Sequence, residues 1–165
     1  MNKKPSIEAV ALFTTMRRLG LSLSSAESCT GGMASAAITD IAGASSFYNG
    51  GLIAYSNTIK EKMLGVPADI LVRHGAVSKE TALAMASGAA LAFESDCAFA
   101  ITGIAGPDGA TEDKPLGTVW FAYAIAGTTL AERRCFTGER SAVREAATAH
   151  ALSRMSVLAE EYSKQ

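Results

Sequence analysis

Cysteine and histidine are scarce in this sequence, and their scarcity limits the chemistry it can support. Only three of the 165 residues are cysteine and only two are histidine. Cys29, Cys97 and Cys135 are odd in number, and none lies in a CxxC or Cys/His ligand spacing. This usage predicts a reducing compartment and argues against a structural zinc site. We therefore expect no metal.

The sequence also lacks an excess of charge of either sign and any long apolar run. Its 15 basic and 16 acidic residues give a net charge of −1, which offers no reason to expect a nucleic-acid or membrane surface. The longest apolar run, TVWFAYAIAG, is far too short for a membrane-spanning helix. The basic start, MNKK, leads into an amphipathic helix that contains charges, unlike a signal peptide. We expect a soluble cytoplasmic protein.

Apolar residues are plentiful, at 48% of the sequence, although aromatic residues make up only 7%. A chain of 165 residues buries roughly 70% of its unfolded surface, enough for a core without disulfides or metals. Abundant alanine suits helices that pack tightly on a sheet. We expect one domain over residues 1–165, because no linker, repeat or low-complexity segment divides the chain.

Helical and strand patterns alternate along the chain. Ser6 and Gly20 bound a first helix, and further helices are predicted at 33–40, 57–65, 67–75, 79–94 and 140–162. Strands are predicted at 21–26, where LSLSSA alternates like a half-buried strand, near 50–55, at 97–103, and as an antiparallel pair within 117–137. The order predicts an α/β fold, a three-layer α/β/α sandwich with a mixed, mostly parallel sheet. Ligands of such sheets bind where loops leave the carboxyl ends of strands, here at 27–32, 55–62 and 102–115.

The first of these loops, AESCTGG, combines a serine, a cysteine and two glycines at the start of a helix. Backbone N–H groups of Thr30, Gly31 and Gly32 are expected to point outward, ready to stabilise a phosphate or an oxyanion near Ser28. Alternatively, Ser28 or Thr30 simply caps the helix. Cys29 is a rival nucleophile, because a helix start lowers a thiol pKa, but its small size also suits packing.

A serine nucleophile needs a base, and this sequence offers few. His74 follows a helix end and can neutralise it, while His150 lies within the last helix, where a half-buried packing role is expected. The segment YSNTIKEK places Lys60 and Lys62 after a strand end, beside Tyr55. A lysine base must fall from a pKa of about 10.4 to roughly 7–8, which requires desolvation or a nearby positive centre. Otherwise the lysines form a solvated helix face.

Two further segments carry candidate binding groups. Thr102 and Gly103 follow a buried strand directly and open a long loop, in which residues 108–114 form either a lid or a solvated charged patch. Arg140 and Arg144 lie four residues apart at the start of the last helix. They form either a phosphate clamp or surface ion pairs with neighbouring glutamates.

The segments AESCTGG, YSNTIKEK, HGAVSKETA, TGIAGPDGATEDKPLGTVW and CFTGERSAVR together resemble the CinA C-terminal-domain family. The resemblance covers essentially the entire chain, and AESCTGG and GIAGPDG are specific in combination. It implies an amidase that hydrolyses the carboxamide of nicotinamide mononucleotide, a linear amide, to nicotinate mononucleotide and ammonia in pyridine-nucleotide salvage. It also implies a small-molecule nucleotide substrate, no cofactor and a homo-oligomer.

The resemblance assigns roles residue by residue. It implies Ser28 as nucleophile, Lys60 as base and Tyr55 as a third catalytic group that orients the pair or relays a proton. It implies substrate contacts at Thr30, Gly31, Gly32, Thr102, Gly103 and Arg140, with Arg140 preferred over Arg144. Two alternatives stay open: a hydrolase of another amide or nucleotide, and a non-catalytic module that binds a nucleotide or a partner protein.

Overall fold

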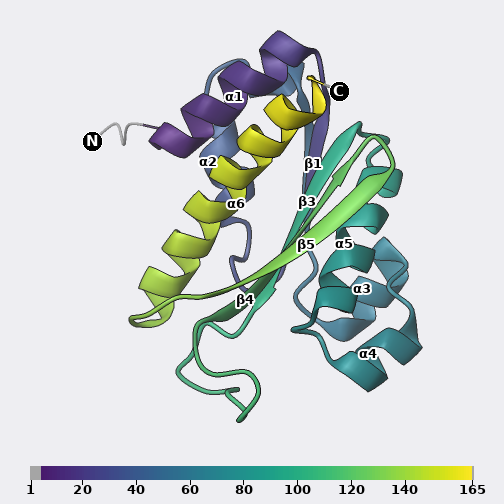
Figure 1. Cartoon of the computed structure of the whole chain (residues 1–165), viewed down its shortest axis with the longest axis vertical. Coiled ribbons are helices and arrows are strands. Elements are labelled where there is room, and N and C mark those ends of the chain that lie inside the picture. The colour runs from purple at the N-terminus through teal and green to yellow at the C-terminus, as the bar shows by residue number, and fades with distance from the viewer. Residues whose placement is uncertain (1–4, 165) are drawn as a thin grey trace.

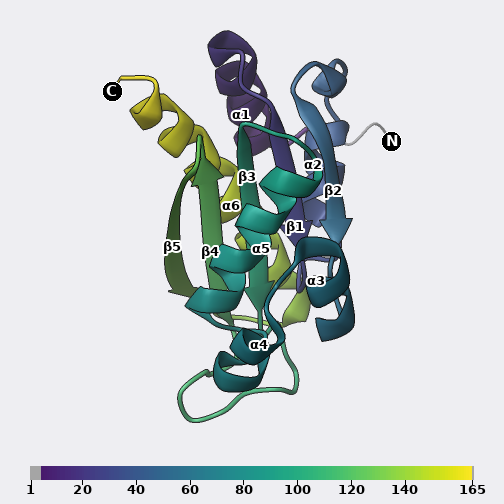
Figure 2. The same cartoon turned by 90° about the vertical axis from the view of Figure 1, so that its right-hand side faces the viewer.

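The computed structural model describes residues 5–164, which form one five-stranded sheet between two layers of helices (Figures 1 and 2). The sheet order is β2-β1-β3-β4-β5. The strands are β1 (Leu23–Glu27), β2 (Tyr48–Ile53), β3 (Cys97–Gly103), β4 (Thr118–Ile125) and β5 (Thr128–Cys135). The helices are α1 (Ile7–Leu19), α2 (Met33–Thr39), α3 (Asn57–Leu64), α4 (Ala68–His74), α5 (Lys79–Ala92) and α6 (Arg140–Tyr162), with a 3₁₀ turn at Ala44–Ser46.

The sheet is mixed, as the sequence predicts. Strand β1 pairs in parallel with β2 and β3, whereas β4 pairs antiparallel with β3 and β5. Four strands therefore run in one direction and β4 alone opposes them. Helices α1, α2 and α6 cover one face, and α3, α4 and α5 cover the other (Figure 1). The predicted three-layer α/β/α sandwich is confirmed.

The two faces of the sheet carry side chains of different size. On β3, Phe99 and Ile101 face the layer of α1, α2 and α6, whereas Ala98 and Ala100 face α5. Because small side chains line the second face, the alanine-rich α5 can lie close to the sheet. Helix α5 also touches α3: a Cβ at Gly88 would lie 2.0 Å from the carbonyl oxygen of Leu64, so only glycine fits there.

Serine caps explain why the helix starts were predictable. The Oγ atoms of Ser6, Ser56 and Ser78 each accept a backbone N–H in the first turn of α1, α3 and α5. The last helix has the predicted bounds, Arg140–Tyr162. Within residues 5–164, no helix has the length and apolar character needed to span a membrane.

The expectation of a half-buried first strand is wrong. All five residues of β1 are buried, because helices cover both faces of this central strand. Its serines are accommodated by other hydroxyls: Ser24 Oγ lies 2.7 Å from Ser95 Oγ, and Ser25 Oγ lies 2.7 Å from the Tyr48 hydroxyl. Serine in this strand therefore does not indicate a solvent-facing side.

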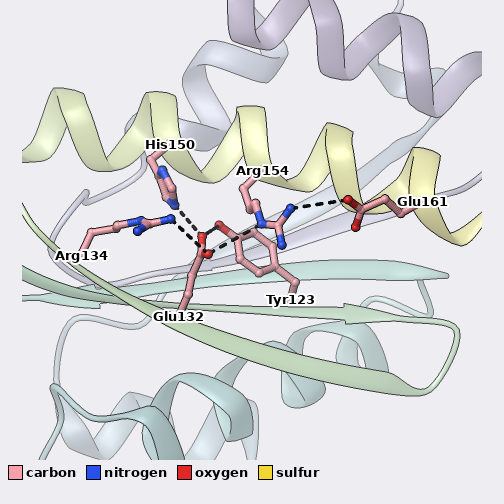
Figure 3. Close-up of polar contacts among 6 residues, drawn as sticks. All are labelled: Tyr123, Glu132, Arg134, His150, Arg154 and Glu161. Atoms are coloured by element: carbon pink, nitrogen blue, oxygen red, sulfur yellow. Dashed lines mark hydrogen bonds and ion pairs between the residues drawn. The ribbon is translucent and has the colours of Figure 1, made fainter.

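A cluster of charged side chains joins β5 to α6 (Figure 3). Glu132 lies 2.5 Å from His150 Nε2 and 3.6 Å from a guanidinium nitrogen of both Arg134 and Arg154. The hydroxyl of Tyr123 donates to the same carboxylate at 3.5 Å. We call these five residues the Glu132 cluster. Its interactions tie the edge strand to the last helix. His150 is half-buried and packs against Phe121, as the sequence suggests, but it also contacts Glu132.

The carboxyl ends of β1, β2 and β3 meet at one edge of the sheet. Ala54, just after β2, donates its N–H to Glu27 O at 2.8 Å, and Ser28, just after β1, donates its N–H to Ile101 O at 2.9 Å. These bonds bring together loops that are distant in sequence. The arrangement positions the site described next.

Candidate active site

Ser28 and Lys60 are brought together at the carboxyl ends of β1 and β2. The Lys60 Nζ lies 3.1 Å from Ser28 Oγ, although the two residues are 32 positions apart. Ser28 begins the turn between β1 and α2, and Lys60 lies in the first half of α3, which Ser56 caps. Lys60 is completely buried and Ser28 is 9% exposed. The predicted pair is thus in hydrogen-bonding contact.

The buried lysine is surrounded by oxygen atoms but by no carboxylate. Its Nζ also donates to Ala54 O at 2.7 Å and to Tyr55 O at 3.1 Å. Among the residues that the structure describes, Lys60 forms no ion pair. Burial lowers its pKa below the 10.5 of an exposed lysine, and the nearby Cys29 acts in the opposite direction. The alternative interpretation, in which Lys60 lies on a solvated face of the helix, is therefore wrong.

Cys29 has the properties of a packing residue. Its side chain is buried among apolar residues, and this burial raises the pKa of the thiol to about 11. A thiol with such a pKa stays protonated near neutrality, and a protonated thiol is a weak nucleophile. The expected lowering by the helix start is thus outweighed by desolvation.

Glu27, to which sequence reasoning gave no role, is fully buried beside this pair. Its carboxylate accepts the backbone N–H groups of Gly32, Ala34 and Ser35, at 3.0, 3.1 and 2.8 Å. These are N–H groups that the start of a helix leaves without a backbone partner. Its position directly before Ser28 was the only sequence signal for this function.

The expectation that the N–H groups of Gly31 and Gly32 point outward is wrong. The Gly31 N–H donates to Ser28 O at 3.1 Å, and the Gly32 N–H donates to the Glu27 carboxylate. Both glycines adopt positive φ angles, 59° and 97°, which permit the tight turn. Thr30 is fully buried, and its Oγ1 has no hydrogen-bond partner among the described residues.

Thr102 and Gly103 make structural contacts. Thr102 is 1% exposed and its hydroxyl donates to Ala76 O at 2.8 Å, which fixes the segment before α5 to β3. A Cβ at Gly103 would lie 2.7 Å from Val119 Cγ2, so glycine is needed for the close approach of β4. Their position at the edge of the site is as predicted, but their own contacts are to the protein.

Tyr55 lies beside the pair through its backbone rather than its phenol. Its carbonyl oxygen accepts from Lys60, whereas its hydroxyl, on a side chain of a residue 59% exposed, accepts from Arg140 Nη2 at 3.2 Å. The structure thus connects the phenol to Arg140. A proton relay between Ser28 and Lys60 through this hydroxyl is not what the geometry supports.

The two arginines near the start of α6, Arg140 and Arg144, have separate partners. Arg140 donates to Gly106 O at 2.8 Å and to Tyr55, while Arg144 donates to Cys29 O and Thr30 O, each at 3.0 Å. Neither forms an ion pair within residues 5–164, so the surface pairs considered as an alternative are absent there. No sequence pattern predicts the contacts of Arg144 with the carbonyl groups of Cys29 and Thr30.

A cleft of about 620 Å³ lies between the start of α6 and the loop after β3. Its lining includes Gly106, Pro107, Leu116, Arg140, Ser141 and Arg144. Ser28 does not line it, but Arg140 bridges the cleft to Tyr55, whose carbonyl contacts Lys60. The loop is held at its far end, where Lys114 Nζ donates to His74 O at 2.9 Å.

Comparison with known proteins identifies the family. The sequence model of the CinA C-terminal domain matches residues 7–158. The chain belongs to the CinA C-terminal domain family. It is 50% identical over 138 residues to the nicotinamide-nucleotide amidohydrolase PncC of Escherichia coli K12, covering 83% of this chain and 84% of that protein.

Other relatives show the same domain in longer chains and in solved structures. A CinA-like protein of Citrifermentans bemidjiense is 52% identical over 129 residues, which are 78% of this chain and 31% of that protein. A crystal structure of a CinA superfamily protein from Klebsiella pneumoniae 700603 matches with a TM-score of 0.92 at 33% identity. The match covers 96% of this chain and 99% of that one.

Proposed function

We propose that this chain hydrolyses the carboxamide of nicotinamide mononucleotide to nicotinate mononucleotide and ammonia, in pyridine-nucleotide salvage. The relative of 50% identity named nicotinamide-nucleotide amidohydrolase supports the substrate. The observation that carries the proposal is the 3.1 Å contact between Ser28 Oγ and the fully buried Lys60 Nζ. Such a pair can attack a carbonyl carbon, because a neutral amine accepts the serine proton.

The surroundings of Lys60 favour its neutral form as the base. A neutral amine has two N–H bonds and one lone pair. Lys60 Nζ lies within hydrogen-bonding distance of Ala54 O, Tyr55 O and Ser28 Oγ. In the neutral amine that we propose, the two carbonyl oxygens accept its N–H bonds and its lone pair accepts the Ser28 O–H. Desolvation without a counter-charge moves the lysine pKa in the same direction.

The reaction follows two steps. Ser28 Oγ attacks the amide carbon while Lys60 takes its proton, and the tetrahedral intermediate collapses as Lys60 returns the proton to the departing ammonia. Lys60 then takes a proton from water as the water attacks the acyl ester, and it passes this proton to the departing Ser28 Oγ, which releases the acid product and restores both residues. Because Gly31 and Gly32 donate elsewhere, we assign the oxyanion to the N–H groups of Cys29 and Thr30.

Arg140 is the proposed contact of the nucleotide phosphate. Arg140 and Arg144 both line the cleft at the start of α6, where a helix terminus favours an anion. Arg144 holds two carbonyl groups of the turn after Ser28, whereas one of the two partners of Arg140 is the exposed Tyr55 hydroxyl, so we assign the phosphate to Arg140. Tyr55 orients Arg140 in this proposal. Thr30, Gly31, Gly32, Thr102 and Gly103 shape the turn and the strand end next to the substrate.

The proposal is tested by incubating the purified protein with nicotinamide mononucleotide and assaying both ammonia and the acid product. We expect stoichiometric release of the two, and none from the Ser28→Ala variant. A thermal shift on adding the nucleotide with no ammonia released would instead favour a non-catalytic binding module. Turnover of other carboxamides in preference to this nucleotide would point to a different amidase.

Three further properties stay predictions. We expect a single amidase domain over residues 1–165, a homo-oligomer and a cytoplasmic location. Light scattering during size-exclusion chromatography measures the oligomeric state directly. A monomeric mass at the concentration of the activity assay would overturn that expectation.

A further inference from the structure

Two charged residues outside the Ser28–Lys60 pair contact the same turn. We define this turn, residues 28–32, as the nucleophile turn. Glu27 holds N–H groups and Arg144 holds carbonyl groups, and both belong to regular elements, β1 and α6. Neither side chain contacts Ser28 Oγ or Lys60 Nζ among the described hydrogen bonds.

The Glu27 carboxylate is saturated with donors. Oε2 accepts from the N–H groups of Gly32 and Ala34, and Oε1 accepts from the N–H and the hydroxyl of Ser35, at 2.8 and 2.7 Å. Four bonds use both oxygen atoms of a fully buried side chain. The arrangement fixes the end of the nucleophile turn to the strand from which Ser28 emerges.

Arg144 fixes the middle of the same turn. Its Nε and Nη2 donate to Cys29 O and Thr30 O, both at 3.0 Å, in a fork that suits a planar guanidinium. A Cβ at Gly31 would lie 3.3 Å from Nη2, so a side chain there would crowd the arginine. The helix that carries Arg140 into the cleft thus also supports the nucleophile.

We propose that Glu27 and Arg144 are positioning residues that keep Ser28 Oγ in line with Lys60 Nζ. The inference rests on the proposed role of Ser28 as nucleophile. The nucleophile turn contains two adjacent glycines with positive φ, so its backbone has few steric constraints of its own. A displacement of about 1 Å at a reacting atom costs on the order of 100-fold in rate. Two oppositely charged clamps supply the missing rigidity.

The decisive variant is Glu27→Gln, which keeps the size of the side chain. A glutamine amide has only one acceptor oxygen. Its NH₂ group would therefore face backbone N–H groups that one of the two Glu27 carboxylate oxygens accepts. We expect kcat to fall about 100-fold while KM changes less than about threefold, since the nucleotide contacts are untouched. Glu132→Gln, in the Glu132 cluster, is the matched control and should keep both constants.

Arg144 provides a second, independent variant. Arg144→Lys keeps the charge but loses the fork, so we expect partial loss of kcat, and a larger loss in Arg144→Ala. A positioning role predicts this graded loss of kcat. A simple charge effect predicts wild-type kcat for Arg144→Lys, because lysine keeps the positive charge. This graded series also carries the test if Glu27→Gln fails to fold.

The rate at which Ser28 reacts with a covalent probe is a further measurement, and a change in helix stability alone would not alter it. A fluorophosphonate bonds to an activated serine oxygen with loss of fluoride and requires no nucleotide recognition. In variants that melt cooperatively above the assay temperature, the labelling rate should fall in the same ratio as kcat. Folded Glu27→Gln and Arg144→Ala proteins with wild-type labelling and kcat would overturn the inference.

The outcomes separate this inference from the proposed function. If the wild-type protein is labelled at Ser28 but releases no ammonia from nicotinamide mononucleotide, the substrate is wrong and the labelling rates still decide the positioning. If the wild-type protein neither labels nor hydrolyses, Ser28 is not an activated nucleophile and both proposals fail.

Discussion

The Ser28–Lys60 pair and the Glu132 cluster differ in how a charged side chain is compensated by its neighbours. Glu132 contacts Arg134 on its own strand and His150 and Arg154 on α6, so that two arginines compensate its charge (Figure 3). Lys60 is more deeply buried and contacts only a hydroxyl and two carbonyl groups. A neutralised cluster stabilises a fold, whereas a base without a counter-charge has a lowered pKa and can accept a proton.

The largest effect is expected from Ser28→Ala. Removing the proposed nucleophile should lower kcat by about 10⁴-fold or more, because the remaining groups supply only binding and electrostatic stabilisation. The melting temperature should hardly change, since one hydroxyl is lost. Ammonia release measures kcat, and thermal denaturation measures the melting temperature. Near-normal turnover in Ser28→Ala, together with its loss in Cys29→Ala, would assign the reaction to the thiol.

Replacement of Lys60 tests the uncompensated base directly. Lys60→Met should abolish turnover and at the same time raise the free energy of unfolding, since it removes a lysine that is costly to bury. Below the lowered folded pKa, wild-type protein carries the full cost of the buried charge. Between that pKa and 10.5 the unfolded chain binds more protons, so wild-type stability rises with pH and the advantage of Lys60→Met shrinks.

Urea unfolding from pH 6 to 10 measures this difference. Wild-type kcat should rise over the same range as Lys60 loses its proton. A Lys60→Met protein that is less stable than wild type at every pH would show that the three hydrogen bonds of Lys60 Nζ outweigh the cost of burying it.

Arg140→Ala should act on substrate binding. Loss of a charge-assisted contact to phosphate is expected to raise KM about 10- to 100-fold with a smaller change in kcat. Arg154→Ala, which removes an arginine of the same helix from the Glu132 cluster, is the matched control and should leave KM unchanged. An equal increase in KM for Arg140→Ala and Arg154→Ala would show that the cleft and the Glu132 cluster do not differ in their effect on substrate binding.

Glu132→Ala should have the reverse profile of Lys60→Met. It leaves Arg134, His150 and Arg154 facing each other, and we expect a loss of about 1–3 kcal/mol in the free energy of unfolding with kcat retained. Chemical denaturation measures the free energy of unfolding, and the ammonia assay measures kcat. A drop in kcat without a change in stability would mean that the cluster belongs to the site.

The smallest effect is expected from Cys29→Ala. The buried thiol, with a pKa of about 11, contributes packing rather than chemistry. We expect a loss of about 1 kcal/mol in stability and less than about a threefold change in kcat. Steady-state kinetics at several pH values would reveal any thiolate participation as a change in the pH profile.

Much of the fold followed from local signals, because Ser6, Ser56 and Ser78 cap helices and the apolar runs are strands. The burial of β1 did not, since its serines are satisfied by side chains from distant segments. A half-buried pattern and a strand with hydroxyl partners on both faces look alike in sequence.

The candidate site was predictable only through the family resemblance. Locally, Lys60 looked like a solvated helix residue, and its burial depends on the approach of α3 to the carboxyl ends of the strands. The functions of Glu27 and Arg144 depend on N–H and carbonyl groups whose directions only the folded turn defines. No spacing in the sequence encodes those directions.

Trapping the covalent intermediate tests the central claim most directly. Wild-type protein mixed with nicotinamide mononucleotide, quenched in acid within one turnover, is digested and the peptides are weighed by mass spectrometry. The account predicts an acyl adduct of the nucleotide on the peptide that contains Ser28, located on Ser28 by fragmentation and absent from Ser28→Ala. An adduct on Cys29, or continued turnover by Ser28→Ala, would contradict it.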